Sequence, residues 1–393
     1  MELTKKQQEG LDIAVKRYHN REKYTVISGY AGTGKSTLVK FIISALNVNP
    51  DRVCYSAFTG KAVEVLKKKG NPNVFTLDKL LYAHFPKPNG GFFRKRKPIL
   101  DYDVVVVDEV SMAPKSLIDI LFSHHCYVIC LGDPFQLPTI NKNEDNHLLE
   151  HPHVFLDEIM RQAEDSEIIQ LSLKIRNGES LDFFNGNNVK ILPISALSDS
   201  MLLWADQILV GTNATRISYN NYIRKLLGRG DAPEDGDKVI CLRNYWDEIN
   251  ANGDALVNGT IGYLRNSFKT FVSTPPYLKI PDNKLDVLQA DFEVDNEVFT
   301  NVDMDNKMIL TGEKCCDWQT EYKLNRRKNK DSKSIVPKEF TYGYAITCHK
   351  AQGSEWDKVL ILEEAFPFDP VEHTRWLYTA ITRASDKVVI IRR

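Results

Sequence analysis

Short runs of apolar, β-branched residues alternate with longer stretches of helical periodicity through the first part of the chain. The continuous hydrophobicity of these runs is typical of strands that are buried on both faces. Strands are predicted for 24–28, 53–57, 104–107 and 127–131. Helices are predicted for 35–46, 61–69 and 114–122. This alternation favours a parallel sheet covered by helices on both faces, so residues 1–160 are expected to form an α/β domain.

The same alternation returns in the second half of the chain. Further strands are predicted for 207–210, 359–362 and 388–391, and further helices for 215–227 and 372–382. A second α/β domain is therefore expected from residues 161–232 and 339–393. Residues 233–338 contain strand-like runs and turns but no convincing helix, which predicts a β-rich insertion in that domain. Residues 82–100 include Asn89-Gly90, a strong turn signal, and predict a small protruding hairpin in the first domain.

The composition is that of an ordinary globular protein. Of the 393 residues, 42% are hydrophobic and 26% charged, and no apolar run approaches the ~18 residues of a membrane-spanning helix. The net charge of −1 does not indicate nucleic-acid binding, but a local basic groove is compatible with it. The polar start predicts no signal peptide, and seven cysteines without a Cys-x-x-Cys pair are typical of a reducing cytosol. We therefore expect a cytoplasmic protein without a membrane segment.

Residues 29–36 read Gly-Tyr-Ala-Gly-Thr-Gly-Lys-Ser and match the phosphate-binding pattern G-x-x-x-x-G-K-[ST]. The match follows a predicted strand and opens a predicted helix, which is the context that the pattern requires. Its glycines allow backbone N–H groups to wrap around phosphates at a helix N-terminus. Lys35 is expected to reach the β- and γ-phosphates, and Ser36 to bind Mg²⁺. The nucleotide-binding residues predicted from this segment are Gly32, Thr33, Gly34, Lys35, Ser36 and Thr37.

Nucleotide hydrolysis also needs carboxylates and cations around the phosphates. Asp108 and Glu109 follow a predicted strand, at the edge of the sheet where α/β proteins bind ligands. Asp108 is expected to hold Mg²⁺ and Glu109 to be the general base; such a pair is more often a solvated loop, but the phosphate-binding pattern favours catalysis. Gln136 is a candidate sensor of the γ-phosphate. Arg161 and Arg383 are candidates for the cation that stabilises the developing charge.

Taken in order, these and further segments resemble the motifs of superfamily 1 helicases, closest to the RecD-like 5′→3′ branch, superfamily 1B. The matching segments are 3–7, 29–36, 56–62, 74–77, 108–109, 132–138, 344–355 and 378–384. The resemblance implies that Gln7 reads adenine and that Gln352 lies near ATP. It also implies that Arg161 falls in the motif IV region and that Arg383 is the arginine finger.

The resemblance further implies a set of DNA-binding residues, of which two lie beside the turn of the predicted hairpin. The set is Phe58, Thr59, Lys61, Phe92, Phe93, Thr347 and His349. Phe92 and Phe93 are placed to stack on the first base pair of a duplex, and packing against their own domain is the alternative interpretation. Phe58 stands where the family usually has proline, and Asp78 where it usually has histidine, so the grip on the strand is expected to differ.

The fold implied by the resemblance has two RecA-like P-loop domains with ATP and Mg²⁺ between them. The hairpin at 82–100 corresponds to the pin insertion (1B) of the family, and residues 233–338 to its SH3-like β-barrel insertion (2B). The implied activity is that of a monomeric phage or bacterial DNA helicase that moves 5′→3′ on single-stranded DNA and opens duplexes. It would act at a duplex junction, with a single-strand-binding protein or another replication or recombination partner. Two alternatives stay open: an RNA helicase or translocase of the Upf1-like branch, and a nucleotide-gated loading adaptor.

Overall fold

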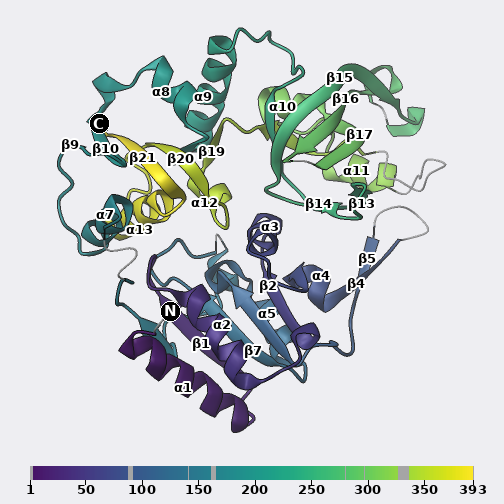
Figure 1. The fold of residues 1–393 in the computed structure, drawn as a ribbon. Coiled ribbons are helices and arrows are strands. Elements are labelled where there is room, and N and C mark those ends of the chain that lie inside the picture. Colours follow the sequence, from purple (N-terminus) through teal and green to yellow (C-terminus); the bar gives the residue numbers. More distant parts are fainter. Residues whose placement is uncertain are drawn as a thin grey trace. The chain divides into compact units, whose positions relative to one another are not determined.

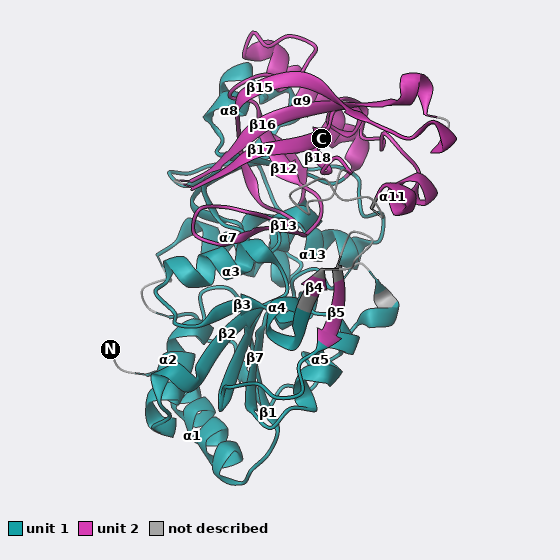
Figure 2. Ribbon diagram, turned by 90° about the vertical axis from the view of Figure 1, so that its right-hand side faces the viewer, with its two compact units in different colours: residues 1–83, 96–211, 348–393 teal, residues 84–95, 212–347 magenta. Residues whose placement is uncertain are grey.

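The structure is a computed structural model that describes residues 3–86, 92–139, 141–160, 165–278, 280–295, 297–325 and 336–392. Its helices and strands are labelled in Figure 1. The chain divides into two compact units, which Figure 2 shows in different colours. Unit 1 comprises Met1–Ala83, Arg96–Gly211 and Cys348–Arg393. Unit 2 comprises His84–Lys95 and Thr212–Thr347.

The first sheet of unit 1 has six parallel strands in the order β3-β2-β6-β7-β1-β8. These strands are β1 (Tyr24–Gly29), β2 (Val53–Ala57), β3 (Val74–Thr76), β6 (Val104–Asp108), β7 (Tyr127–Gly132) and β8 (Val154–Leu156). Successive side chains of a strand point to opposite faces. Val104 and Val106 therefore pack in one hydrophobic core, and Val105 and Val107 pack in the other. The run of four valines is buried on both sides, as the sequence predicts for a central parallel strand.

Helices cover both faces of this sheet. The helices on the face of Val104 are α1 (Lys5–His19), α2 (Lys35–Leu46) and α3 (Gly60–Lys68). The helices on the opposite face are α4 (Leu77–Leu81) and α5 (Lys115–Phe122). The periodicity predicted α2, α3 and α5 but not α1, whose start is fixed by a capping box. In that box the Thr4 hydroxyl accepts from the N–H of Gln7 at 3.2 Å, and the Gln7 side chain accepts from the N–H of Thr4 at 3.0 Å.

Parallel strands bring their C-terminal ends to one edge of the sheet. Ser28 of β1 is paired with Gly132 of β7, and Ala57 of β2 is paired with Asp108 of β6. The phosphate-binding segment, the two carboxylates and the segment 132–138 therefore leave the sheet along the same edge. This edge positions the candidate site.

The second sheet of unit 1 includes four strands that are mutually parallel and one short antiparallel strand. Along the sheet they follow the order β11-β20-β21-β10-β9. The strands are β9 (Phe184–Asn185), β10 (Val189–Pro193), β11 (Gln207–Val210), β20 (Trp356–Leu362) and β21 (Ala384–Arg392). The helices of this part are α7 (Glu167–Arg176), α8 (Asp199–Trp204), α12 (Cys348–Ala351) and α13 (Pro370–Ile381). The α/β fold with two parallel sheets is thus confirmed.

Unit 2 is built mainly from antiparallel strands. Its main sheet has five strands in the order β17-β16-β15-β12-β18. These are β12 (Lys238–Cys241), β15 (Ile261–Ser273), β16 (Lys284–Val294), β17 (Glu297–Asp305) and β18 (Phe340–Tyr342). Four shorter strands pair as β4 (Tyr82–Pro86) with β5 (Phe92–Arg96) and as β13 (Tyr245–Ile249) with β14 (Ala255–Leu256), and β19 is Ala345–Thr347. Phe292 and Phe340 lie in its core with ring centroids 5.1 Å apart.

A buried ion pair joins the helix α9 (Asn213–Leu226) to this sheet. Two nitrogens of Arg224 bind the two carboxylate oxygens of Asp237 at 2.9 and 3.0 Å, and both side chains are at most 5% exposed. The hydroxyl of Tyr344 donates to Asp237 at 2.9 Å, and the Arg224 guanidinium lies 4.4 Å from the centroid of the Tyr342 ring. The pair is therefore fully enclosed by protein contacts.

Two sequence-based expectations for unit 2 concern helices within 233–338 and the turn of the hairpin. Residues 233–338 were expected to lack a convincing helix, and this was wrong, since they contain α10 (Asn306–Thr311) and α11 (Trp318–Asn325). Local chemistry explains α10: the carboxylate of Asp305 caps its first turn by accepting from Met308 N at 3.0 Å, and Gly312 ends it at φ = 78°. The predicted turn at Asn89-Gly90, between β4 and β5, lies outside the described residues.

The compact units divide the chain differently from the domains expected from its sequence. The strands of the two parallel sheets given above belong to unit 1, whereas residues 212–232 and 339–347, expected in the second α/β domain, and residues 84–95 of the hairpin expected in the first domain fall in unit 2. The functional boundaries therefore stay a prediction. Among the described residues, no helix is long and apolar enough to cross a membrane.

Candidate active site

The phosphate-binding segment forms a tight loop between β1 and α2. Gly32 and Gly34 both have φ = 77°, a conformation that glycine adopts without strain. A Cβ on Gly34 would also lie 2.5 Å from Nε2 of Gln7, so the neighbouring side chain leaves no room for one. Gly34 provides no side-chain cap for α2, and the first backbone N–H groups of a helix have no partner within the helix, which suits a phosphate.

Lys35 begins α2 and points back over the loop. Its ammonium donates to the carbonyl oxygens of Gly29 at 2.7 Å and Tyr30 at 2.9 Å. Burial lowers the pKa of Lys35, while the carboxylates of Asp133 and Asp108 oppose that change. The ammonium is therefore held inside the loop that the sequence assigns to phosphate binding.

The side chain of Gln7 forms a hydrogen bond with the backbone of this loop. Its side-chain N–H donates to the carbonyl oxygen of Thr33 at 3.2 Å, and its side-chain oxygen is bound to Thr4 in the capping box. The side chain is 1% exposed. The structure thus places Gln7 next to the nucleotide-binding loop, with both ends of its amide engaged within the protein.

Glu109 lies at the end of β6 and pairs with Arg383. An oxygen of Glu109 is 3.3 Å from a guanidinium nitrogen of Arg383, and the other carboxylate oxygen is buried with no hydrogen-bond partner among the described residues. Burial raises the pKa of Glu109, and the positive charge of Arg383 opposes the rise. Asp108 accepts from the N–H of Glu109 at 2.9 Å. A buried carboxylate with one unbonded oxygen is suited to accept a proton.

Arg383 follows α13 and is only 6% exposed. Its guanidinium donates to the carbonyl oxygens of Thr379 and Ser354, each at 3.2 Å, and to the hydroxyl of Thr382 at 3.2 Å. These bonds fix the direction in which its remaining charge faces, which is toward Glu109. The structure therefore brings together two of the residues that the sequence assigned to catalysis.

Two of the three predicted glutamines, Gln136 and Gln352, are found at one turn, after β7. Gln352 is 3% exposed and donates from its side chain to the carbonyl oxygen of Leu137 at 2.7 Å. Gln136 is half-buried in the same turn, and its backbone N–H donates to the carbonyl oxygen of Asp133 at 3.3 Å. Thr379 of α13 also reaches this turn, where its hydroxyl accepts from the N–H of Leu137 at 2.9 Å.

Asp133 and Tyr378 are two site residues that the sequence reasoning missed. The hydroxyl of Tyr378 donates to Asp133 at 2.6 Å and accepts from the N–H of Ala31 in the phosphate-binding loop at 3.0 Å. Burial raises the pKa of Tyr378, so the phenol stays protonated and keeps this role as a donor. A signal was present, since Tyr378 and Thr379 carry hydroxyls within the fully buried helical stretch 376–381.

A Mg²⁺ ion fits the residues that the sequence assigned to it. Mg²⁺ is usually held by one or two carboxylates together with substrate phosphates and water. Ser36 is exposed at the start of α2, and Asp108 ends the neighbouring part of the sheet edge. Among the described residues, no group of three or more His, Cys, Asp or Glu side chains is placed to hold a metal by itself. The donor set thus suits a metal that arrives with a nucleotide.

Several of the predicted DNA-binding residues lie in unit 1. Phe58 follows β2 and is 39% exposed, Thr59 caps α3 by accepting from Ala62 N at 3.2 Å, and Lys61 pairs with Glu64 at 2.8 Å. His349 is half-buried in α12, and burial lowers the pKa of its imidazole.

Gly353 connects these residues to the hydrolytic site. A Cβ on Gly353 would lie 2.8 Å from the hydroxyl of Thr59 and 3.2 Å from a carboxylate oxygen of Glu109. The predicted strand contact at Thr59 and the predicted general base are thus neighbours around one glycine.

The remaining predicted residues are in unit 2 or outside the described part of the chain. Thr347 ends β19, and Phe93 on β5 is 45% exposed and stacks on Phe85 of β4 with ring centroids 5.3 Å apart. Phe93 therefore packs within the hairpin and keeps an exposed surface. Arg161 and the side chain of Phe92 lie outside the described residues.

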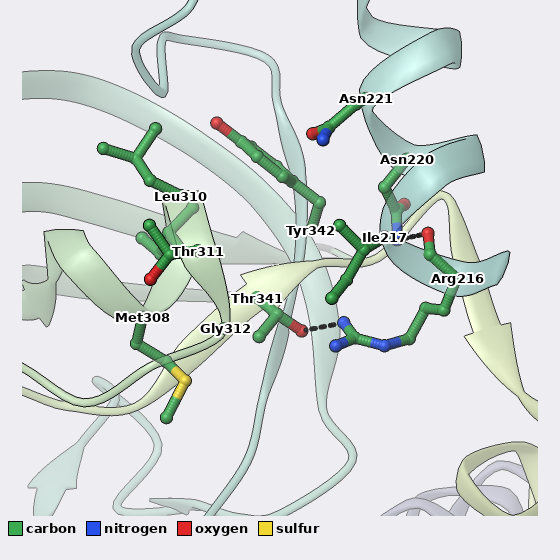
Figure 3. Close-up of a pocket in the computed structure, with 11 residues that line it drawn as sticks. Arg216, Ile217, Asn220, Asn221, Met308, Leu310, Thr311, Gly312, Thr341 and Tyr342 are labelled. Carbon is green, nitrogen blue, oxygen red and sulfur yellow. Dashed lines mark hydrogen bonds between the residues drawn. The ribbon is translucent and has the colours of Figure 1, made fainter. Parts of the chain in front are cut away.

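Unit 2 contains a separate hollow that is lined by residues of α9, α10 and β18, shown in Figure 3. Arg216 donates to the hydroxyl of Thr341 at 3.0 Å, as drawn there, and the side chain of Asn220 binds both the N–H and the carbonyl oxygen of Ala345 at 2.9 Å. These polar side chains are occupied in joining α9 to the strands of unit 2. The hollow is therefore a feature of packing, and the chemistry is concentrated in unit 1.

Comparisons with known proteins agree on one kind of relative. A family model described as an AAA domain matches residues 2–188, and one described as a UvrD-like helicase C-terminal domain matches residues 342–391. The chain is 26% identical to the ATP-dependent RecD2 DNA helicase of Deinococcus radiodurans, over 93% of this chain and 46% of the relative. It is 24% identical to the ATP-dependent DNA helicase dda of Enterobacteria phage T4, over 97% of each chain.

Solved structures give the same picture for the fold. The structure of Bacteroides Pif1 bound to single-stranded DNA matches with a TM-score of 0.55 and 17% identity, over 100% of this chain and 92% of that one. At this identity the likeness is one of fold. The chain spans less than half the length of the Deinococcus relative and nearly the whole length of the phage relative.

Proposed function

We propose that this chain is a superfamily 1B helicase, of the group of RecD, Dda and Pif1, and that it acts as an ATP-dependent DNA helicase. It would move 5′→3′ along single-stranded DNA and open duplex DNA with the energy of ATP hydrolysis. The observation that carries the proposal is the contact of Arg383 with Glu109. A cation and a buried carboxylate meet beside a phosphate-binding loop, which is the set of groups that phosphoryl transfer to water needs.

The proposed roles follow from the positions of the side chains. Lys35 would exchange its two carbonyl partners for the β- and γ-phosphates of ATP. Ser36 and Asp108 would hold Mg²⁺, which neutralises charge on the phosphates. Glu109 would accept a proton from the attacking water, and Arg383 would balance the charge that develops on the transferred phosphoryl group.

Further residues would refine this chemistry. Arg161 is proposed as a second cation on the phosphates. Gln7 is proposed as a contact to adenine, for which its side-chain N–H would have to leave the carbonyl oxygen of Thr33. Gln136 and Gln352 meet at one turn, so they are proposed to respond to the presence of the γ-phosphate. Tyr378 would hold the loop and Asp133 in register while this occurs.

The DNA path is proposed from the resemblance together with exposed side chains. Phe58, Thr59, Lys61 and His349 of unit 1 and Thr347 of unit 2 would contact the strand. We propose that the β4–β5 hairpin is the pin of the family, with Phe92 and Phe93 at the duplex junction. Residues 233–338, which contribute four of the five strands of the main sheet of unit 2, would be its SH3-like insertion.

The functional domains would follow the sequence-based division, with 1–160 and the hairpin at 82–100 as the first RecA-like domain and its insertion. Residues 161–232 and 339–393 would be the second RecA-like domain, and the protein would act as a monomer at a fork.

Unwinding of a partial duplex with a single-stranded tail on either the 5′ or the 3′ end tests the proposal. We expect ATP- and Mg²⁺-dependent opening from the 5′ tail, loss of opening in Lys35→Ala, and unchanged opening in Lys174→Gln, a surface control on α7. Opening from the 3′ tail alone would overturn the direction. A Lys35→Ala variant that hydrolyses ATP at the wild-type rate would overturn the site.

Strand-stimulated ATP hydrolysis on single-stranded DNA and RNA of the same sequence separates the two alternatives. Stronger stimulation by RNA would favour the Upf1-like reading. The absence of any turnover, with nucleotide binding intact, would favour a loading adaptor. The pairing of Glu109 with Arg383 supports a hydrolytic enzyme over an adaptor.

A further inference from the structure

Tyr30, the second residue of the phosphate-binding loop, is held between two side chains from elsewhere in unit 1. The guanidinium carbon of Arg176, the last residue of α7, lies 3.6 Å from the centroid of the Tyr30 ring. Phe155 of β8 contacts the same ring edge-on, with centroids 5.3 Å apart and planes at 83°. The ring is therefore fixed by a cation–π contact and by an aromatic one.

The position of this ring bears on the shape of the loop. The carbonyl oxygen of Tyr30 accepts from the ammonium of Lys35 at 2.9 Å, from the hydroxyl of Thr33 at 2.8 Å and from the N–H of Thr33 at 3.4 Å. The backbone N–H of Tyr30 donates to Leu156 at 3.4 Å. The backbone of Tyr30 thus takes part in several hydrogen bonds that shape the loop. A side chain that fixes the position of Tyr30 also stabilises these hydrogen bonds.

The contact with the Tyr30 ring does not compete with an ion pair of Arg176. Within the described part of the chain, no carboxylate lies at ion-pair distance from its guanidinium. Asp157, a nearby acid whose pKa Arg176 helps to lower, is paired with Lys6. The guanidinium therefore faces the Tyr30 ring as its main partner.

We propose that Arg176 is a positioning residue that keeps the phosphate-binding loop in its nucleotide-binding shape by acting through the ring of Tyr30. The inference rests on the proposed function and adds to it an arginine that none of the motifs includes. The contact does not involve Lys35, so it persists when Lys35 turns to the phosphates. Its effect is expected on the affinity for nucleoside di- and triphosphates rather than on the hydrolytic step.

The alternative is that Arg176 only stabilises the C-terminus of its own helix, α7. A cation at a helix C-terminus stabilises the helix through the macrodipole, independently of any nucleotide. That role would change the stability of the protein when Arg176 is replaced, but it would leave nucleotide affinity unchanged. The two readings are therefore separable by a binding measurement.

The test compares five variants of the full chain in equilibrium binding of fluorescent ADP and in strand-stimulated ATP hydrolysis. They are Arg176→Gln, Arg176→Lys, Tyr30→Leu, Tyr30→Phe and the double variant Arg176→Gln/Tyr30→Leu. We expect Arg176→Gln and Tyr30→Leu each to raise the Kd for ADP and the KM for ATP about 2- to 30-fold, the range of a cation–π contact, with kcat within about twofold of wild type. Tyr30→Phe keeps the ring and should lose clearly less affinity than Tyr30→Leu, and Arg176→Lys, which keeps only the charge, should be intermediate.

The double variant gives the sharpest outcome. If Arg176 acts through Tyr30, the double variant loses no more affinity than either single one, because both remove the same contact. Additive losses, or an Arg176→Gln variant that binds ADP as tightly as the surface control Lys174→Gln, would overturn the inference. Should Arg176→Gln fail to fold, the comparison of Tyr30→Leu with Tyr30→Phe still decides it, since equal affinities would refute a role for the ring. A wild-type chain that neither binds ADP nor hydrolyses ATP would instead refute the proposed function.

Discussion

Replacing Arg383 with alanine removes the cation that faces Glu109. In the structure this guanidinium is 6% exposed and is fixed by bonds to Ser354, Thr379 and Thr382. In the proposed reaction it would meet the nucleotide already oriented, without the entropy loss of ordering a surface arginine. Alanine removes that charge and leaves the loop and Asp108 in place.

The expected loss of turnover is large. An arginine that stabilises the charge of phosphoryl transfer contributes a factor of about 10³–10⁵ to kcat, which corresponds to roughly 4–7 kcal/mol of activation free energy. The same substitution leaves Glu109 without its cation. Breaking a fully buried pair costs about 3–5 kcal/mol, but the Glu109 side chain is 22% exposed, so a smaller loss of folding free energy of about 1–3 kcal/mol is expected.

Glu109→Gln is the companion variant that separates chemistry from stability. The amide keeps an oxygen for Arg383 but cannot accept a proton from water, so kcat is expected to fall by about 10²–10⁴. The folding free energy should fall by less than in Arg383→Ala, because a neutral amide avoids the burial of a charge. Both variants should bind ADP with nearly wild-type affinity.

The assay is single-stranded-DNA-stimulated phosphate release, measured well below the unfolding temperature of each variant, with thermal unfolding recorded in parallel. Arg383→Lys is the matched control, since it keeps the charge but not the fork of nitrogens, and should recover part of kcat. A folded Arg383→Ala protein with kcat within about threefold of wild type would refute the assignment. So would a loss of ADP binding that matches the loss of kcat.

Two further substitutions test the loop and the buried pair of unit 2. Gly34→Ala should abolish ADP binding, because φ is 77° and the new Cβ would lie 2.5 Å from Nε2 of Gln7. The control is Gly70→Ala, where φ is 76° but the space around the new Cβ is open. Equal ADP binding by the two variants would contradict the reasoning. Asp237→Ala leaves Arg224 buried without its partner and should lower the free energy of unfolding in urea by about 3–5 kcal/mol, so a change below 1 kcal/mol would show that the pair is not needed.

The parts of the fold that the sequence predicts are those with strong local patterns. The four valines of 104–107 predict a strand that is buried on both faces, and the structure has this strand. The phosphate-binding pattern predicts the start of α2 at Lys35. The distal part of β15 was missed because Asn266, Ser267 and Lys269 interrupt any apolar alternation. A bulge after Arg265 and exposure of both faces explain why that strand needs no such pattern.

The candidate site residues that the sequence indicates are those with a strong local context, and the ones it misses reach the site only through long-range contacts. Lys35 and Glu109 are recognisable from their own context. Gln7 was assigned to adenine by resemblance, but its capping box directs the amide toward the carbonyl oxygen of Thr33, a contact that only the packed helix reveals. Tyr378 and Arg176 act on the loop across more than a hundred residues of sequence, and no local pattern encodes that distance.

These long-range contacts have a common direction. Arg383, Tyr378 and Arg176 all come from helical segments associated with the second sheet, and they reach Glu109, Ala31 and Tyr30 around the first. In the proposed mechanism, a change in the loop on nucleotide binding would be transmitted to α7 and α13 through Tyr378 and Arg176. A change of charge on the γ-phosphate would first affect the contact between Glu109 and Arg383. A movement of the loop would first affect the contacts at Tyr30 and Ala31. We expect the state of the nucleotide to be coupled in this way to α7 and α13, through contacts that end at Glu109, at the backbone N–H of Ala31 and at the ring of Tyr30.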